Sequence, residues 1–154
     1  MVADIQLELD RALGDQQEAE IDRVVQLATA FYHEKRNLLI QTPARPYSTS
    51  AGNEASRPES VRCDIGRLIG MIIAELLKKI QISGLFLTGG GIAAEVIRQM
   101  KGKGIILVKD LSPLVPLGRL TGGPFDGLRV VTKGGGVGDT DTIVRAVNYF
   151  RNNR

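Results

Sequence analysis

The hydrophobic and polar positions of the N-terminal part predict a strand, a helix and a second strand. Ile5, Leu7 and Leu9 alternate with polar residues, which is the two-residue period of a strand with one face in water. An acidic stretch at 15–20 opens a helical pattern, and the apolar run within 37–41 predicts a buried strand. The apolar residues that share one face of this helix are Ile21, Val24, Val25, Ala28 and Phe31.

The clearest helical pattern in the chain covers residues 61–80. Its apolar residues recur at intervals of three and four, and their stripe is broad enough to lie against a sheet. Ser60 is placed to cap this helix. Gly66 and Gly70 lie four residues apart inside it, and they indicate either close helix packing or a tolerated local cost of about 1 kcal/mol each. The apolar positions are Val61, Ile65, Leu68, Ile69, Ile72, Ile73, Leu76, Leu77 and Ile80.

Strands and helices also alternate in the second half of the chain. Apolar runs predict buried strands at 84–88, 105–108 and 128–132, and a helical pattern follows the first of them at 92–100. The segment 110–120 contains two prolines and cannot form a regular helix. The last helix is expected to bury one face formed by Ile143, Ala146, Val147 and Phe150.

The order of these elements predicts the fold class. Strands that alternate with helices indicate an α/β layered domain, with a largely parallel sheet flanked by helices. The 154 residues are enough for a single domain over 1–154. The segment 42–58 is rich in Ser, Thr, Pro, Asn and Gly and has no apolar period, so we expect a long mobile loop there.

Two glycine-rich turns each follow a strand and precede a helix. The first is Gly89-Gly90-Gly91, and it suits an anion because the first N–H groups of a helix are unpaired and lie at the positive end of its dipole. The second begins at Lys133, whose ammonium suits a phosphate. A flexible turn with a solvated lysine is the alternative for this second turn alone. Because ligands of parallel sheets sit at the carboxyl ends of strands, we expect the two turns to form two sides of one nucleotide pocket.

Other nucleotide motifs fit less well. The P-loop pattern is absent. Gly89, Gly91 and Ala94 match the dinucleotide fingerprint, and Asp110 lies where a ribose-binding acid would fall. The prolines after Asp110 remove the crossover helix that such a fold needs.

Metal binding and other catalytic chemistry find little support. Asp139 and Asp141 could hold Mg²⁺ beside a phosphate, but helix capping is the favoured interpretation, so no metal site is predicted. His33, near a helix end, is expected to be solvated. No Ser–His–Asp set, zinc-ligand spacing or carboxylate pair is present in the sequence.

Composition excludes further classes of protein. A hydrophobic fraction of 43% and a charged fraction of 24% are those of a soluble globular protein. The net charge of +3, without a basic stripe, argues against a nucleic-acid partner. The single Cys63 excludes an intrachain disulfide, which suits a cytoplasmic protein. No apolar run is long enough for a membrane span, and the first residues lack the pattern of a signal peptide.

Three segments in order carry a family resemblance: Leu85-Phe86-Leu87-Thr88-Gly89-Gly90-Gly91-Ile92-Ala93, Val115-Pro116-Leu117-Gly118-Arg119-Leu120, and the run from Gly122-Gly123-Pro124-Phe125-Asp126-Gly127 to Lys133-Gly134-Gly135-Gly136-Val137-Gly138-Asp139. The chain resembles the C-terminal nucleotide-binding domain of the four-carbon acid sugar kinases, a family long known as a domain of unknown function. The likeness is loose before residue 60 and close after residue 83.

The resemblance implies that the chain binds ATP with Mg²⁺, within a kinase that phosphorylates a four-carbon sugar acid such as threonate or erythronate. It assigns no catalytic residue. Gly135 is the best candidate for a backbone contact in the second turn. The nucleotide-binding residues that the resemblance implies are Thr88, Gly89, Gly90, Gly91, Ile92, Lys133, Gly134, Gly135, Gly136 and Gly138.

Two departures from the family pattern matter. Gly91 stands where the family usually has Asp or Glu, and its presence weakens binding or catalysis if that acid organises metal or nucleotide. The family's N-terminal substrate domain and its serine-containing nucleotide segment have no counterpart in these 154 residues, so we expect both to be supplied elsewhere. We therefore expect a domain that is inactive without a sugar-acid-binding domain or subunit supplied elsewhere, and homo-oligomerisation is left open. The alternatives are a non-catalytic remnant that acts as an interaction or regulatory module, and a fragment of a dinucleotide-binding oxidoreductase.

Overall fold

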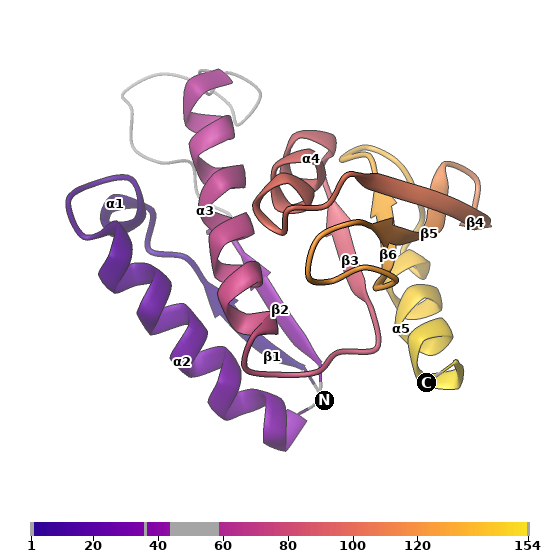
Figure 1. Cartoon of the computed structure of the whole chain (residues 1–154), viewed down its shortest axis with the longest axis horizontal. Helices are drawn as coiled ribbons and strands as arrows, with labels where there is room; N and C mark the ends of the chain where they lie inside the picture. Colours follow the sequence, from indigo (N-terminus) through magenta and orange to yellow (C-terminus); the bar gives the residue numbers. More distant parts are fainter. Residues whose placement is uncertain (1, 36, 44–58, 154) are drawn as a thin grey trace. The chain divides into compact units, whose positions relative to one another are not determined.

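The computed structural model describes residues 2–35, 37–43 and 59–153 (Figure 1). The mobile loop predicted at 42–58 lies almost entirely outside the described residues. The chain forms two compact units, Met1–Ile80 and Gln81–Arg154, and each is considered by itself. The single domain predicted over 1–154 stays a prediction.

Unit 1, residues 1–80, is a small parallel sheet with helices packed beside it. Its two strands pair in parallel, with Ala3 opposite Leu38. Helix α2 packs on both strands, and α3 packs on α2. In chain order the elements are β1 (Ala3–Gln6), α1 (Leu9–Ala12), α2 (Gln17–Lys35), β2 (Leu38–Gln41) and α3 (Glu59–Leu77).

The sequence pattern anticipates unit 1 closely. Ala3 and Ile5 are buried and alternate with exposed neighbours, as predicted for a strand with one wet face. Leu9 does not continue that strand; it begins α1 instead. The prediction that residues 37–41 form a buried strand is wrong in part, because β2 is only half-buried and Leu39 is 41% exposed. Gly66 and Gly70 are both buried within α3, which favours the close-packing interpretation.

Unit 2, residues 81–154, contains a four-stranded sheet with the strand order β3-β6-β5-β4. β3 and β6 run parallel, whereas β5 is antiparallel to both β6 and β4. The α/β class is confirmed, and the sheet is mixed where a largely parallel one was expected. In chain order the elements are β3 (Leu85–Thr88), α4 (Gly90–Gln99), β4 (Gly104–Ser112), β5 (Val115–Thr121), β6 (Arg129–Lys133) and α5 (Thr142–Asn152).

A hairpin of β4 and β5 accounts for this difference. The segment 110–120, which its prolines exclude from a regular helix, is mostly strand. Pro116 fits because its partner Asp110 lies between two register shifts of β4, and β6 pairs with β5 only from Leu117 onward. The strand predicted at 105–108 is confirmed as part of β4, but its predicted burial is wrong, because β4 is the edge strand and Ile106 is 65% exposed.

Helices α4 and α5 lie on either side of β3 and β6 (Figure 1). One face of the sheet packs on α5 around a cluster of Val115, Leu117, Val131, Ala146 and Phe150. Leu87 and Val130 are buried at the alternate positions, and α4 contacts their two strands. Ile143 was expected on the buried face of α5, but it is 54% exposed, because the helix turns Thr142 inward instead. Among the described helices none is long and apolar enough to cross a membrane.

Candidate functional site

The two glycine-rich turns leave neighbouring strands at the same edge of the unit 2 sheet. β3 and β6 pair in parallel, so Thr88 lies opposite Lys133 at their carboxyl ends. The next residue, Gly89, donates its backbone N–H to the carbonyl oxygen of Lys133 at 2.9 Å. The two turns therefore begin side by side, as the strand–turn–helix pattern predicted.

The first turn leads straight into α4 and presents bare backbone. Gly89 is the N-cap residue, with φ of 91° and ψ of 117°, and its carbonyl accepts the N–H of Ala93 at 2.9 Å. The N–H groups of Gly90, Gly91 and Ile92 precede this first intrahelical bond and have no acceptor within the helix. Gly90 and Gly91 are exposed, and a Cβ built on either meets nothing within 4 Å. The first turn of α4 contains no acidic residue, so its dipole is left free to attract an anion.

The second turn is equally open. Gly134, Gly135 and Gly136 are exposed, and a Cβ built on Gly135 or Gly136 meets nothing within 4 Å. The one backbone hydrogen bond across it runs from the N–H of Val137 to the carbonyl of Gly134 at 3.3 Å, among the described contacts. Gly138 ends the turn with φ of 91°, a conformation that other residues rarely adopt.

Lys133 connects the two turns. Its ammonium donates to the hydroxyl of Thr88 at 3.4 Å and to the carbonyls of Gly134 at 2.8 Å and Gly135 at 3.3 Å. An ammonium has three donors, and these three oxygens match that number. The lysine therefore holds a positive charge at the junction of the turns, which disfavours the interpretation of a merely solvated side chain.

The charge of the chain is unevenly shared between its units. Residues 81–154 contain ten Lys and Arg against five Asp and Glu, a formal charge of +5. Residues 1–80 contain ten against twelve, a formal charge of −2. The modest net charge of the whole chain hid this difference, and the unit that contains both glycine turns is the one that would attract a polyanion.

Asp139 is engaged within the protein. Its carboxylate accepts the N–H of Asp141 at 3.1 Å and the hydroxyl of Thr142 at 3.1 Å, and it pairs with the guanidinium of Arg145. The hydrogen bond from Arg145 is the main reason that the pKa of Asp139 lies below its ordinary value. The prediction that Asp139 caps α5 is wrong, because its carboxylate bonds the N–H of the N-cap residue and two side chains rather than an N–H of the first helical turn. The helix N-cap residue, Asp141, makes no side-chain capping bond.

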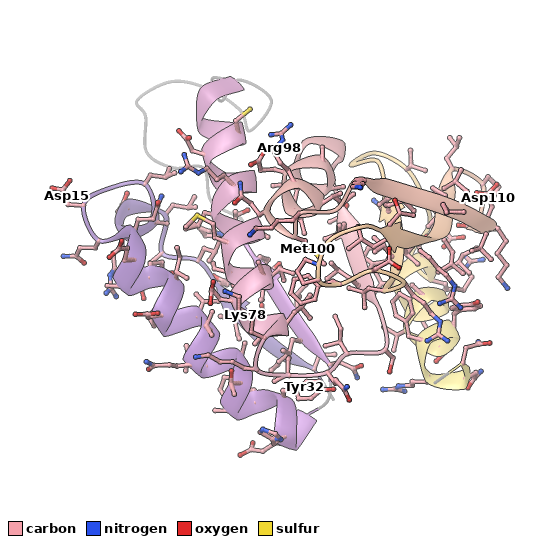
Figure 2. The ribbon with its side chains drawn as sticks, in the orientation of Figure 1. Asp15, Tyr32, Lys78, Arg98, Met100 and Asp110 are labelled. Carbon is pink, nitrogen blue, oxygen red and sulfur yellow. The ribbon has the colours of Figure 1, made fainter. Side chains whose placement is uncertain are left out.

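Two other candidate residues, Asp110 and Asp126, do not belong to the two glycine turns. Asp110 lies on β4, the strand farthest from β3 in the sheet order (Figure 2), so the dinucleotide interpretation, which pairs it with the Gly89 turn, is wrong. Asp126 accepts the N–H of Gly122 at 2.5 Å and is a turn residue.

Among the described residues no group of three or more His, Cys, Asp and Glu could hold a metal ion. Sequence reasoning missed Arg145, because its contact with Asp139 depends on how α5 begins and leaves no signal in the spacing of residues.

Comparison with known proteins decides the family. The model of a family described as "Nucleotide-binding C-terminal domain" matches residues 2–143. The chain belongs to this family. The match covers most of the described residues of both units, and it confirms the resemblance to the C-terminal domain of the four-carbon acid sugar kinases.

Relatives of the nucleotide-binding C-terminal domain are larger proteins. A D-threonate kinase of Salmonella typhimurium is 27% identical over 151 residues, which is 95% of this chain and 36% of the kinase. A D-threonate kinase of Bordetella bronchiseptica is 40% identical over 90 residues, 58% of this chain and 22% of the kinase. The chain thus spans about a third or less of the curated relatives that it matches.

A solved structure supports the fold. A domain of unknown function from Bordetella bronchiseptica, solved with bound citrate as a domain-swapped dimer, matches with a TM-score of 0.78 at 28% identity. The match covers 99% of this chain and 36% of that one.

Proposed function

We propose that the two glycine turns of unit 2 bind the phosphates of ATP, within a kinase that phosphorylates a four-carbon sugar acid. The observation that carries the proposal is the parallel pairing of Thr88 with Lys133, which brings both turns to one edge of the sheet. The exposed N–H groups of Gly90 and Gly91 supply donors from one side, and the Lys133 turn supplies a cation from the other.

Catalysis in such an enzyme rests on positioning and charge stabilisation. The nucleotide site that we propose comprises Thr88, Gly89, Gly90, Gly91 and Ile92 on one turn, and Lys133, Gly134, Gly135, Gly136 and Gly138 on the other. Mg²⁺ enters bound to the phosphate oxygens, since the described residues offer no cluster of metal ligands.

The sugar acid is a hydroxyl acceptor held by another domain or subunit. The names of the relatives, D-threonate kinase and D-erythronate kinase, support a four-carbon sugar acid. The chain spans only 36% of the Salmonella kinase, which supports a second domain as the source of the acid site. Alone, the chain binds ATP and turns over little or no sugar acid.

Self-association is a further part of the proposal. The Bordetella structure is a domain-swapped dimer. The edge strand β4 of this chain exposes Ile106, Leu107 and Val108, which are 65%, 68% and 54% exposed. Light scattering tests this part, with a mass of twice 16.7 kDa expected for a dimer.

A non-catalytic interaction module is the second candidate, and Gly91 favours it, because the family usually has an acid there. Calorimetric titration of the full chain with Mg-ATP separates the two functions. Our proposal predicts saturable binding, with ATP preferred over NAD. The absence of saturable binding contradicts it and supports the interaction module.

A further inference from the structure

Asp139, which follows the second glycine turn, is joined to the first residue of α5, Thr142, by three hydrogen bonds. The N–H of Asp139 donates to the hydroxyl of Thr142 at 2.9 Å, and that hydroxyl donates to the Asp139 carboxylate at 3.1 Å. The backbone N–H of Thr142 donates to the Asp139 carbonyl at 3.2 Å. Three bonds thus join the same two residues.

This connection is buried at Thr142 and exposed at Asp139 and Arg145, whose side chains are 59% and 43% exposed. Thr142 is 2% exposed, so water has little access to its hydroxyl and competes little for these hydrogen bonds. The guanidinium of Arg145, one turn further along α5, pairs with the other oxygen of the Asp139 carboxylate. One carboxylate therefore connects the end of the turn to two positions of the helix.

Among the described contacts, the hydrogen bonds within the glycine turn come from the Lys133 ammonium to the carbonyls of Gly134 and Gly135 and from the N–H of Val137 to the Gly134 carbonyl. Gly138 adopts φ of 91°, and a Cβ built there would lie 2.6 Å from the Thr142 hydroxyl oxygen, so the turn ends in close contact with that residue. Gly135 and Gly136 have open space around them. The conformation of 134–136 consequently depends on its two ends, which are Lys133 at the end of β6 and Asp139, which is hydrogen-bonded to α5.

The geometry points to Asp139 as the positioning residue that holds the glycine turn of Lys133 in place for phosphate, and this inference rests on the proposed function. Asp139 touches no ligand in this role. Its carboxylate fixes the far end of the turn, so that the N–H groups of Gly135 and Gly136 do not have to be ordered at the moment of binding. In this inference the Asp139 carboxylate binds Thr142 and Arg145 and is not a ligand of Mg²⁺.

The test compares Asp139→Ala and Asp139→Asn with Asp141→Asn as matched control. Asp141 lies two residues away and loses the same charge, but its carboxylate makes no capping bond. ATP affinity is measured by calorimetry with Mg²⁺ and with EDTA. We expect Asp139→Ala to weaken affinity about tenfold in both conditions, Asp139→Asn to weaken it less, and the control to match the parent chain.

Two affinity results overturn the inference. A loss confined to the samples with Mg²⁺ makes Asp139 a metal ligand, and equal affinity for Asp139→Ala and the control confines its role to the start of α5. Amide hydrogen exchange of residues 134–138 is the second readout, with faster exchange expected in Asp139→Ala and unchanged exchange contradicting the inference.

Exchange also separates this inference from the proposed function. If the parent chain binds no ATP, the proposed function fails, and exchange alone decides the role of Asp139. If Asp139→Ala does not fold, Arg145→Met removes one contact of the same carboxylate and is expected to speed exchange at 134–138 by a smaller factor. Unchanged exchange in Arg145→Met then overturns the inference.

Discussion

The backbone N–H of Gly89 donates a hydrogen bond of 2.9 Å to the carbonyl oxygen of Lys133, 44 residues further along the chain. This bond extends the parallel pairing of β3 with β6 by one residue, to the point where both strands give way to glycine. A helix N-terminus and a lysine are thereby held at one edge of a sheet.

Lys133→Ala is expected to weaken Mg-ATP binding by about tenfold or more, because the turns lose the charge at their junction. Lys109→Ala is the matched control: it removes the same charge from β4, where the ammonium lies 4.6 Å from the Tyr149 ring centroid. Calorimetry of both variants measures the effect. Equal affinities in the two variants would remove Lys133 from the site.

Gly89→Ala is expected to lower the free energy of unfolding by roughly 1–2 kcal/mol, because φ of 91° is strained for any residue with a Cβ. Gly90→Ala serves as control, since its Cβ enters open space and the change costs less than about 0.5 kcal/mol. Denaturant unfolding monitored by circular dichroism gives both values. A Gly89→Ala chain as stable as Gly90→Ala would contradict the strain argument.

Glu20→Gln is expected to destabilise unit 1 by roughly 1–3 kcal/mol at pH 7. The Glu20 side chain is fully buried, and its carboxylate accepts Arg23 Nε at 2.7 Å, Arg23 Nη2 at 2.6 Å and the N–H of Glu8 at 2.8 Å. Glu18→Gln, an exposed change in the same helix, is the control and should be near neutral.

The same carboxylate gives stability a predictable pH dependence. Burial raises the pKa of Glu20, but the hydrogen bonds from Arg23 and Glu8, with the charge of Arg23, outweigh it and leave the pKa below its ordinary value. A lowered pKa contributes stability that is fully present above about pH 4.3 and is lost as the pH falls through the folded-state value. The deficit of Glu20→Gln relative to the parent should therefore be constant from about pH 6 to 8 and shrink towards pH 3. A deficit that stays constant down to pH 3 would contradict this assignment.

The isolated chain is expected to release little or no ADP when D-threonate or D-erythronate is supplied with Mg-ATP, because our proposal assigns the acid site to another domain or subunit. A coupled assay for ADP measures this, with an assembled threonate kinase as positive control. Robust turnover by the chain alone would show that it contains an acid site of its own.

The spacing of apolar residues predicted most helices and strands, because these residues recur regularly at the helical or the strand period. The faces of α2 and the strand–glycine–helix step at Gly89 follow directly from the spacing of residues. The β4–β5 hairpin did not, because Pro116 usually excludes a strand and is tolerated here only beside two register shifts. Ile143 was assigned to the wrong face because helical phase alone cannot place a first turn in which hydrogen bonds to Asp139 hold Thr142 inward.

The candidate site was predictable to a different degree at each residue. The glycines and Lys133 are visible as a motif. Their adjacency was an inference from parallel strands, and the pairing of Thr88 with Lys133 supports it. The contact of Asp139 with Arg145 depends on how α5 starts, which no spacing rule specifies. The charge difference between the units was countable in the sequence, but only once the boundary at residue 80 was known.

Titration of the ¹⁵N-labelled chain with Mg-ATP, followed by amide chemical shifts, tests the central claim most directly. The account predicts that the amides of Gly90 and Gly91 and those of Gly134, Gly135 and Gly136 shift together and give one dissociation constant. Shifts confined to one turn, or absent from both, would contradict a shared phosphate site.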